Sequence, residues 1–312
     1  MSNPSPPPAS PQRPSKPSRQ TIGRTPAPPQ VIEELRPGQS IELLKELHIL
    51  TREGKLNQDT RRKLKQVYHL YQFIEPLLNE VCASEQGFTL ADHGAGKSYL
   101  GFILYDLFFN VAHHGQKAAG HIYGIETRAE LVEKSLALAT RLGFARMSFL
   151  NLKVAESTLS AELPERIDIV TALHACDTAT DDAIAFGLDN QARHMVLVPC
   201  CQAEVAGVLK RSRALAMVKT PLAELWRHPL HAREFGSQIT NVLRCLQLEA
   251  SGYQVTVTEL VGWEHSMKNE LILASRPATP QLAKTRAAQV RLQQVLQELG
   301  LGELDRRFAV LA

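Results

Sequence analysis

The sequence of 312 residues has few cysteines, no long apolar run and no strong excess of either charge. Its five cysteines contain no CxxC pair, which excludes the common zinc-binding patterns and suits free thiols in a reducing cytoplasm. No stretch approaches the roughly 20 apolar residues that a membrane-spanning helix requires, and the apolar core of a signal peptide is missing. The formal net charge of +3 gives no overall preference for polyanions. We therefore expect a cytoplasmic protein with no membrane contact and no metal site.

Residues 1–38 differ in composition from the rest of the chain. They hold eleven of the eighteen prolines, together with serine, glutamine and scattered arginine and lysine, and almost no large apolar residue. Such a segment buries too little apolar surface to offset the conformational entropy of folding, so a disordered, mildly basic tail is predicted. This tail either keeps the protein in solution or makes a nonspecific contact with RNA.

A helical extension is predicted over residues 39–84. Apolar residues at helical spacing indicate a first helix from Ile41 to about Leu50 and a second helix over residues 60–81. Pro76 should kink the second helix or end its first part, because proline lacks a backbone N–H.

From residue 85 onward, short apolar runs alternate with amphipathic segments. This alternation is typical of a doubly wound α/β sheet, in which helices connect parallel strands. Strands are expected at residues 88–92, 122–126, 147–150, 167–173, 195–198, 255–261 and 270–274. A polar loop joins the last two strands, so they should form an antiparallel hairpin. We predict a Rossmann-like core of seven strands over residues 85–276, with a helical insertion at 204–230 and a C-terminal helix within 277–312.

The segment LADHGAGKS at residues 90–98 fits two different nucleotide-binding turns. As Asp92-x-Gly94-x-Gly96, it is typical of the turn that binds S-adenosylmethionine (SAM) after a first strand. Its last three residues, Gly-Lys-Ser, instead match the end of a relaxed phosphate-binding P-loop. Both turns use glycine to bend tightly, and both direct the N–H groups of a helix start at the ligand.

Residues elsewhere in the chain favour SAM. A SAM site requires a carboxylate for the ribose hydroxyls at the end of the next strand, and the second strand ends on Glu126. A P-loop requires an acidic metal ligand after a later strand, where this chain has His174. The predicted hairpin is a second argument against a P-loop ATPase. The predicted cofactor-binding residues are Asp92, Gly94, Gly96, Lys97, Glu126 and His174. For the lysine among them, a contact with the SAM carboxylate and a plain surface position are both open.

Polar residues follow the fourth and fifth strands, at the edge where an open α/β sheet binds its ligands. His174 and Asp177 are the candidate general bases for methyl transfer to a ribose hydroxyl or a base nitrogen. Cys200 is the candidate nucleophile of an alternative reaction, transfer to carbon 5 of a pyrimidine, with Cys176 as the second thiol. The competing interpretation of the adjacent cysteines at 200–201 is a pair of buried, unreactive thiols.

Four motifs of the chain resemble a poorly characterised family of methyltransferase-like proteins. They are Asp92–Lys97 (DHGAGK), Leu173–Asp181 (LHACDTATD), Val198–Gln202 (VPCCQ) and Lys268-Asn269. The resemblance covers roughly residues 60–276 and extends distantly to the tRNA 2′-O-methyltransferases. It implies a class I SAM-dependent methyltransferase core, SAM as cofactor and an RNA substrate. The chain lacks the Cys/His zinc modules of the tRNA enzymes, which puts the same tRNA substrate in doubt.

The substrate is predicted to be RNA, either rRNA or tRNA. A basic turn at Arg61, Arg62 and Lys65 precedes the core and suits a phosphate backbone, although a solvated helix face has the same pattern. The remaining predicted substrate contacts are Cys176, Gln202, Lys268 and Asn269. Three other functions stay open: methylation of a small molecule, methylation of a protein, and a catalytically silent SAM-fold scaffold that binds RNA or protein.

Overall fold

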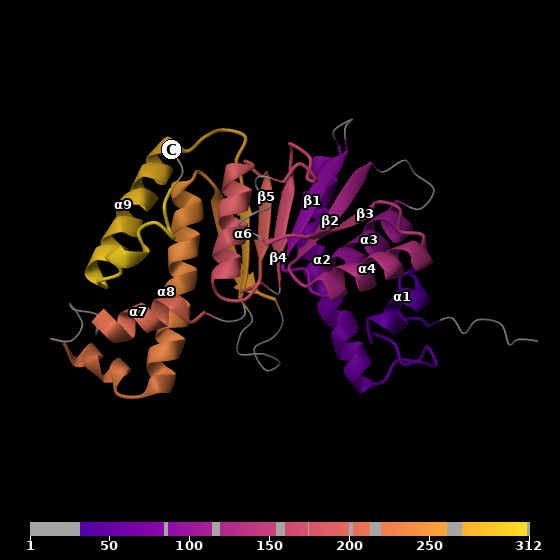
Figure 1. Ribbon diagram of the computed structural model, residues 1–312, viewed down its shortest axis with the longest axis horizontal. Coiled ribbons are helices and arrows are strands. Elements are labelled where there is room, and N and C mark those ends of the chain that lie inside the picture. Colours follow the sequence, from indigo (N-terminus) through magenta and orange to yellow (C-terminus); the bar gives the residue numbers. More distant parts are fainter. Residues whose placement is uncertain are drawn as a thin grey trace, which may run out of the picture. The chain divides into compact units, whose positions relative to one another are not determined.

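The computed structural model describes residues 32–83, 87–113, 119–153, 160–173, 175–199, 202–212, 220–260 and 270–310. The chain divides into two compact units, Met1–Leu35 and Arg36–Ala312. In the first unit only residues 32–35 belong to the described part, where Leu35 N donates to Ile32 O at 3.0 Å. The predicted disorder of the N-terminal tail therefore falls almost entirely outside the described residues. The second unit holds the sheet and the helices (Figure 1).

One sheet of seven strands organises the described part of the second unit, in the order β3-β2-β1-β4-β5-β7-β6 (Figure 1). The strands are β1 (Phe88–His93), β2 (Gly120–Glu126), β3 (Met147–Asn151), β4 (Ile169–Ala172), β5 (His194–Leu197), β6 (Gln254–Glu259) and β7 (Glu270–Ser275). The first five strands pair in parallel, and β7 runs antiparallel to both β5 and β6. The predicted seven-stranded α/β fold and its antiparallel hairpin are confirmed.

The strand order makes the carboxyl ends of β1 and β4 the point where the chain reverses its direction across the sheet. From β1 it proceeds to β2 and β3 on one side, and then returns to β4 and β5 on the other. Ligands of open α/β sheets bind at such a point. Alternate residues of β1 point to opposite faces of the sheet. On one face His93 packs against Phe186, which belongs to α6 (Thr178–Asp189), and on the other face Asp92 lies beside Thr171 of β4.

Helices connect the strands largely as predicted. They are α1 (Ile41–Glu46), α2 (Gln58–Cys82), α3 (Tyr99–Tyr105), α4 (Ala129–Leu142), α6, α7 (Glu204–Ser212), α8 (Pro229–Ala250) and α9 (Leu282–Glu298), with two 3₁₀ helices, η3 (Pro221–Trp226) and η4 (Gly302–Leu304). α2 starts with a capping box, in which the side chains of Asn57 and Thr60 each accept the other's backbone N–H at 2.9 and 2.7 Å. α3 continues as a π-helix, η1 (Asp106–Ala112), and the carboxylate of Asp106 accepts Ser40 N–H at 3.1 Å. This bond ties the helical extension to the core.

One prediction for the helical extension is wrong in detail, and one of two alternatives at Pro76 is excluded. The first helix ends at Glu46, short of its predicted end, because the chain turns at His48, whose φ is 55°. The second helix does not end at Pro76 but runs through it. Proline removes one backbone hydrogen bond, and the buried side chains of Ile74 and Leu78 on either side hold the helix in place by packing.

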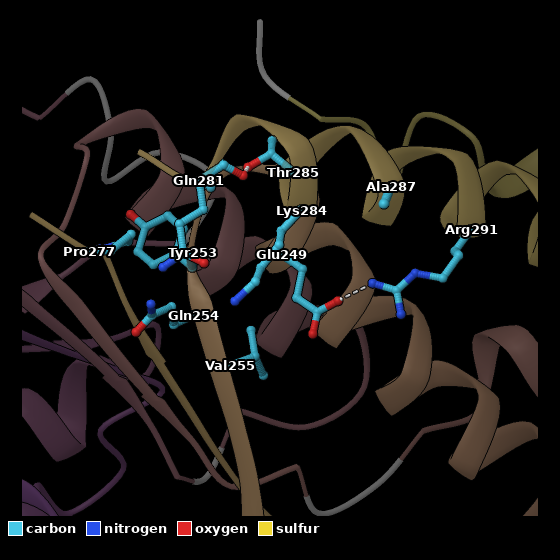
Figure 2. Close-up of a pocket in the computed structure, with 11 residues that line it drawn as sticks. Glu249, Tyr253, Gln254, Val255, Pro277, Gln281, Lys284, Thr285, Ala287 and Arg291 are labelled. Carbon is cyan, nitrogen blue, oxygen red and sulfur yellow. Dashed lines mark hydrogen bonds and ion pairs between the residues drawn. The ribbon is translucent and has the colours of Figure 1, made fainter. Parts of the chain in front are cut away.

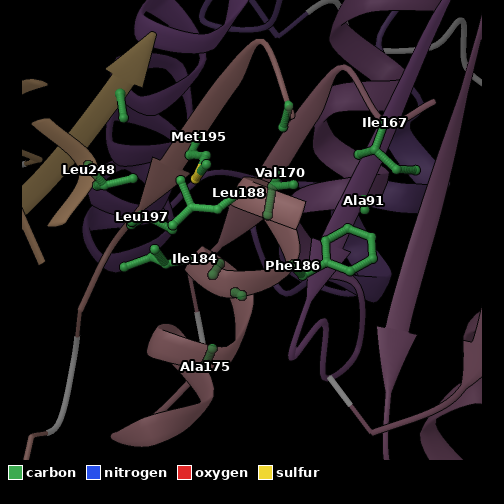
Figure 3. Close-up of a cluster of buried hydrophobic side chains, with 14 of the residues drawn as sticks. Ala91, Ile167, Val170, Ala175, Ile184, Phe186, Leu188, Met195, Leu197 and Leu248 are labelled. Carbon is green, nitrogen blue, oxygen red and sulfur yellow. The ribbon is translucent and has the colours of Figure 1, made fainter. Parts of the chain in front are cut away.

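Two apolar clusters form the core around α6 and α8. The first joins α6, β4, β5, β7 and α8, and includes the buried Phe186, Val170 and Leu197 (Figure 3). The second joins α7, α8, α9 and η4, so the predicted C-terminal helix packs onto α8. Burying a large apolar side chain contributes roughly 1.5–3 kcal/mol. The first cluster includes Ala175 and several residues of α6, so its packing holds α6 and the segment between β4 and α6 against the sheet.

Candidate cofactor site

The turn after β1 requires two glycines for different reasons. Gly94 has a φ of 63°, and a Cβ there would lie 3.1 Å from Ala175 Cα in the segment after β4. Gly96 has a φ of 60° with no backbone crowding, so its backbone conformation alone explains the glycine. Ala95 N donates to Ile125 O at 3.0 Å, which holds the turn against the end of β2. The glycine turn, residues 94–98, thus lies at the carboxyl ends of β1, β2 and β4.

Glu126 lies at this turn. The Gly96 N–H donates to Glu126 Oε2 at 2.8 Å, and only 7% of the residue is exposed. Its other oxygen, Oε1, accepts the backbone N–H and the Nε–H of Arg128 at 3.1 and 3.0 Å. Burial alone would raise the pKa of Glu126, but the hydrogen bonds from Arg128 and Gly96 outweigh it and hold the pKa below its usual value. The structure therefore keeps an ionised carboxylate beside the glycine turn.

The position of Ser98 contradicts the P-loop interpretation. A P-loop serine directs its hydroxyl at Mg²⁺ beside the phosphates. Here Ser98 is fully buried, and a Cβ on Gly101 in α3 would lie 2.7 Å from its Oγ, so the hydroxyl is tucked under α3. Lys97 is exposed, and this position fits both roles predicted for it. The antiparallel β6–β7 hairpin supports the same conclusion.

Asp92 and His93 lie beneath the turn rather than in it. The Thr171 hydroxyl donates to Asp92 Oδ1 at 2.7 Å, and burial raises the pKa of Asp92 to about 7 against the lowering effect of this bond. His93 is fully buried, and its two ring nitrogens have no hydrogen-bond partner in the described part of the chain. The structure gives Asp92 a contact within the sheet, and its predicted contact with SAM stays a prediction.

His93 should make the protein sensitive to acid. Burial lowers the pKa of His93 to about 3, from an ordinary value of 6.5, so the unfolded chain binds the proton more readily than the folded one. The stability from His93 is complete above pH 6.5 and is lost as the pH falls toward 3. Relative to His93→Leu, we expect the wild type to lose on the order of 4 kcal/mol of unfolding free energy over this range. Urea unfolding across the pH range measures the difference, and the exposed His231→Leu serves as control.

If the free energy of unfolding fell equally with pH in the wild type, His93→Leu and His231→Leu, this result would contradict the burial of an uncharged imidazole at position 93.

Asp177 holds α7 in place. Its Oδ1 accepts the N–H groups of Ala203 and Glu204 at 2.9 and 3.3 Å, so the carboxylate caps the start of α7. Its own backbone is strained, with a φ of 52°, and its carbonyl oxygen accepts Arg244 Nη2–H at 2.8 Å. These contacts explain an aspartate at this position by structure, so its predicted role as a general base needs an independent test.

Gln202 is buried, and both ends of its amide group are engaged. Its Nε2–H donates to Asn241 Oδ1 at 2.9 Å, and its Oε1 accepts the Ser237 hydroxyl at 2.6 Å. Asn241 in turn donates to Glu270 Oε2 at 2.7 Å. The structure therefore uses Gln202 to join the segment after β5 to α8, which leaves its predicted contact with the substrate without direct support.

Arg244 completes this buried network and is a residue that was not predicted from the sequence. It is fully buried in α8 and forms two hydrogen bonds to the carboxylate of Asp181 in α6, at 2.7 and 2.8 Å. The available signal was a charged residue within the apolar face of the helix at 229–250.

The other predicted site residues are either exposed or outside the described residues. Cys176 is exposed after β4, and Arg61, Arg62 and Lys65 are exposed on the first turns of α2. The predicted roles of His174, Cys200, Lys268 and Asn269 concern residues that lie outside the described part of the chain. Within that part, no group of three or more His, Cys, Asp or Glu side chains is arranged to hold a metal ion, and no helix is long and apolar enough to cross a membrane.

A separate pocket of about 280 Å³ lies at the opposite edge of the sheet (Figure 2). It is lined by the end of α8, the start of β6 and α9, and an ion pair at 2.9 Å joins Glu249 to Arg291 there. Because β6 starts at the amino edge of the parallel strands, this pocket is remote from the glycine turn.

A methyltransferase family model matches this site. Residues 62–208 match the family described as a methyltransferase domain, a segment that begins in α2, ends in α7 and contains the glycine turn and Glu126. The match supports the predicted class, a methyltransferase. No curated protein matches the chain in sequence.

Solved structures with similar folds are more distant. An rRNA methylase from Streptococcus thermophilus is 10% identical, with a TM-score of 0.40, over 65% of this chain and 94% of its own. Magnesium protoporphyrin IX methyltransferase from Synechocystis is 15% identical, with a TM-score of 0.40, over 76% and 94%. A methyltransferase from Podospora anserina is 9% identical, with a TM-score of 0.43, over 76% and 87%. At such low identity and TM-scores, nothing about the substrate of this chain follows.

Proposed function

We propose that this protein binds SAM at the glycine turn and transfers its methyl group to RNA. The observation that carries the proposal is the 2.8 Å contact between the Gly96 N–H and the Glu126 carboxylate. It brings a turn with two glycines and an ionised carboxylate together at the reversal point of the sheet. Such a pair suits a nucleoside whose ribose hydroxyls donate to Glu126 and whose amino-acid end lies on the turn.

Each part of the site has one task in this proposal. Glu126 holds the ribose, the backbone of Gly94 and Gly96 admits the amino-acid part, and Lys97 is close enough in sequence to contact its carboxylate. Bound SAM supplies a methyl group on a positively charged sulfur, which a nucleophile of the substrate attacks. His174 or Asp177 accepts the proton that a ribose hydroxyl or base nitrogen loses.

Two basic surfaces support RNA as the substrate. The end of α2 lies at the amino edge of the sheet, because Glu80 pairs with Arg193 before β5 at 2.7 Å. With 25 residues, α2 is about 37 Å long, whereas a strand of six residues spans about 20 Å. Its first turns, with Arg62 and Lys65, therefore extend past the strands, as Figure 1 shows. A polynucleotide that reaches the turn from this side would meet these charges.

The second surface is a groove of about 680 Å³ between α7, η3 and the start of α8. Trp226 and three basic side chains, Lys210, Arg227 and Arg233, line it. Aromatic rings among basic groups suit a single-stranded nucleic acid, whose bases stack and whose phosphates are neutralised. Since Asp177 caps α7 at the carboxyl edge of the sheet, α7 connects this groove to the side of the site.

Methyl transfer tests the proposal directly. The protein is incubated with radiolabelled SAM and with RNA, protein and small-molecule fractions of a cell extract. We expect label in the RNA fraction that ribonuclease releases and protease does not. Label confined to protein or to small molecules would reject RNA while leaving the methyltransferase intact, and no label with proven SAM binding would favour a silent scaffold.

The basic turn of α2 should contribute to RNA affinity. We expect Arg62→Glu/Lys65→Glu to weaken binding of single-stranded RNA at least tenfold at low salt and to reduce the slope of log K against log salt by about 1. The matched control is Lys284→Glu/Arg286→Glu on α9, which changes the charge equally on another exposed face. Fluorescence anisotropy at several salt concentrations measures both. Equal losses in the two variants would show that only net charge matters and would remove the argument from α2.

A further inference from the structure

The two oxygens of Glu126 already accept more hydrogen bonds than a carboxylate comfortably holds. Oε2 accepts Gly96 N–H at 2.8 Å and Arg128 Nη2–H at 3.2 Å. Oε1 accepts the Arg128 N–H and Nε–H at 3.1 and 3.0 Å, together with the Thr127 hydroxyl at 3.2 Å. A carboxylate offers about four lone-pair positions. A ribose with two hydroxyls therefore finds no free position on Glu126 in this arrangement.

The side chain of Arg128 is the donor that can leave. The backbone N–H groups of Gly96 and Arg128 are fixed by the glycine turn and by the start of α4, where Arg128 is the N-cap residue. The Arg128 side chain, in contrast, is 60% exposed, whereas that of Glu126 is 7% exposed. The guanidinium also lies over the turn, since a Cβ on Gly96 would be 4.0 Å from Arg128 Nη2. It thus occupies space beside both elements of the cofactor site.

We propose that Arg128 competes with the ribose of the cofactor for Glu126, so that SAM binds only when the guanidinium swings out to solvent. The inference rests on the proposed function, because it assumes that the ribose binds Glu126. The exchange replaces two charge-assisted bonds of an ion pair with bonds from two neutral hydroxyls, and it therefore lowers cofactor affinity. Arg128 is accordingly a positioning residue that sets affinity, with no role in the chemical step.

The exchange predicts an unusual salt dependence. Salt screens the Arg128–Glu126 pair and so weakens the competitor. S-adenosylhomocysteine (SAH) has no net charge at neutral pH, so its own attraction to the site changes little with salt. In the wild-type protein the affinity for SAH should rise with salt concentration, and without the guanidinium this dependence should disappear.

Calorimetric titration with SAH tests the proposal on the full chain. Arg128→Met keeps the aliphatic stem and removes the charge, and we expect it to bind SAH about tenfold more tightly with no gain from added salt. Arg128→Lys keeps the charge but not the planar guanidinium, so its affinity for SAH should lie between those of the wild type and Arg128→Met. The control is Arg141→Met, an exposed arginine on the same helix that pairs with Glu42 and Glu46 at 2.8 and 2.6 Å. Arg141→Met should have the same affinity for SAH, and the same salt dependence, as the wild type.

The outcomes separate this inference from the proposed function. Tighter binding by Arg128→Met, or binding that appears only in that variant, supports the competition. Unchanged or weaker binding by Arg128→Met, with clear binding by the wild type, would overturn it, because the arginine would then be neutral or a direct cofactor contact. If neither protein binds SAH while both remain folded by circular dichroism, the proposed function fails and the competition fails with it.

Discussion

Replacing Glu126 with alanine is expected to weaken SAH binding about a hundredfold. The variant loses two charge-assisted bonds to the ribose, each of about 1.5–3 kcal/mol, and it also loses the acceptor that holds the Gly96 N–H at 2.8 Å. Together the two bonds contribute about 3–6 kcal/mol, and the wild type gives up the exposed Arg128–Glu126 pair to form them, so we expect a net loss of about 3 kcal/mol, roughly a hundredfold in affinity. Isothermal titration calorimetry with SAH measures it.

Glu130→Ala is the matched control, since Glu130 is an exposed carboxylate in the first turn of α4. We expect it to bind SAH like the wild type. The affinity of Glu126→Gln for SAH should lie between those of Glu126→Ala and the wild type, because the amide oxygen still accepts the Gly96 N–H. Normal SAH affinity in a folded Glu126→Ala would show that the ribose binds elsewhere.

Replacing Arg244 with methionine is expected to destabilise the fold by about 3–5 kcal/mol. Arg244 is fully buried, and its removal leaves the carboxylate of Asp181, which is 4% exposed, without its partner. The change also removes the bond to the carbonyl oxygen of Asp177, which caps α7. Urea unfolding followed by circular dichroism measures the free energy of unfolding.

The double variant Arg244→Met/Asp181→Leu distinguishes a buried charge from lost packing. Replacing both partners of a buried ion pair with apolar residues is often neutral, so we expect the second change to recover most of the loss. Arg291→Met, which breaks an exposed pair with Glu249 at 2.9 Å, should cost less than about 1 kcal/mol. A double variant no more stable than Arg244→Met would contradict the view that the unpaired carboxylate causes the damage.

The sequence predicts the sheet well, and it places Glu126 correctly at the end of β2 beside the glycine turn. Periodicity marks each strand within a few residues, and the polar link between β6 and β7 predicts their antiparallel pairing. Glu126 follows from a rule of topology, since the carboxyl ends of neighbouring parallel strands meet at one edge. These predictions depend only on local patterns and on the topology of the sheet, and they require no knowledge of contacts between distant side chains.

Side-chain contacts between distant segments could not be predicted from the sequence. Gln202 and Asp177 are polar residues in loops after strands, a pattern shared by catalytic and structural groups. Only the fold shows that Gln202 meets Asn241, 39 residues away, and that Asp177 caps α7. The ion pair of Arg128 with Glu126 spans two residues, yet no periodic pattern predicts the return of a side chain onto the preceding strand.

Calorimetric titration of the wild-type protein with SAH and, separately, with Mg·ATP tests the central claim most directly. The account predicts saturable binding of SAH at one site per chain and no binding of Mg·ATP, because Glu126 faces the turn and Ser98 is buried beneath α3. Binding of Mg·ATP without binding of SAH would contradict it.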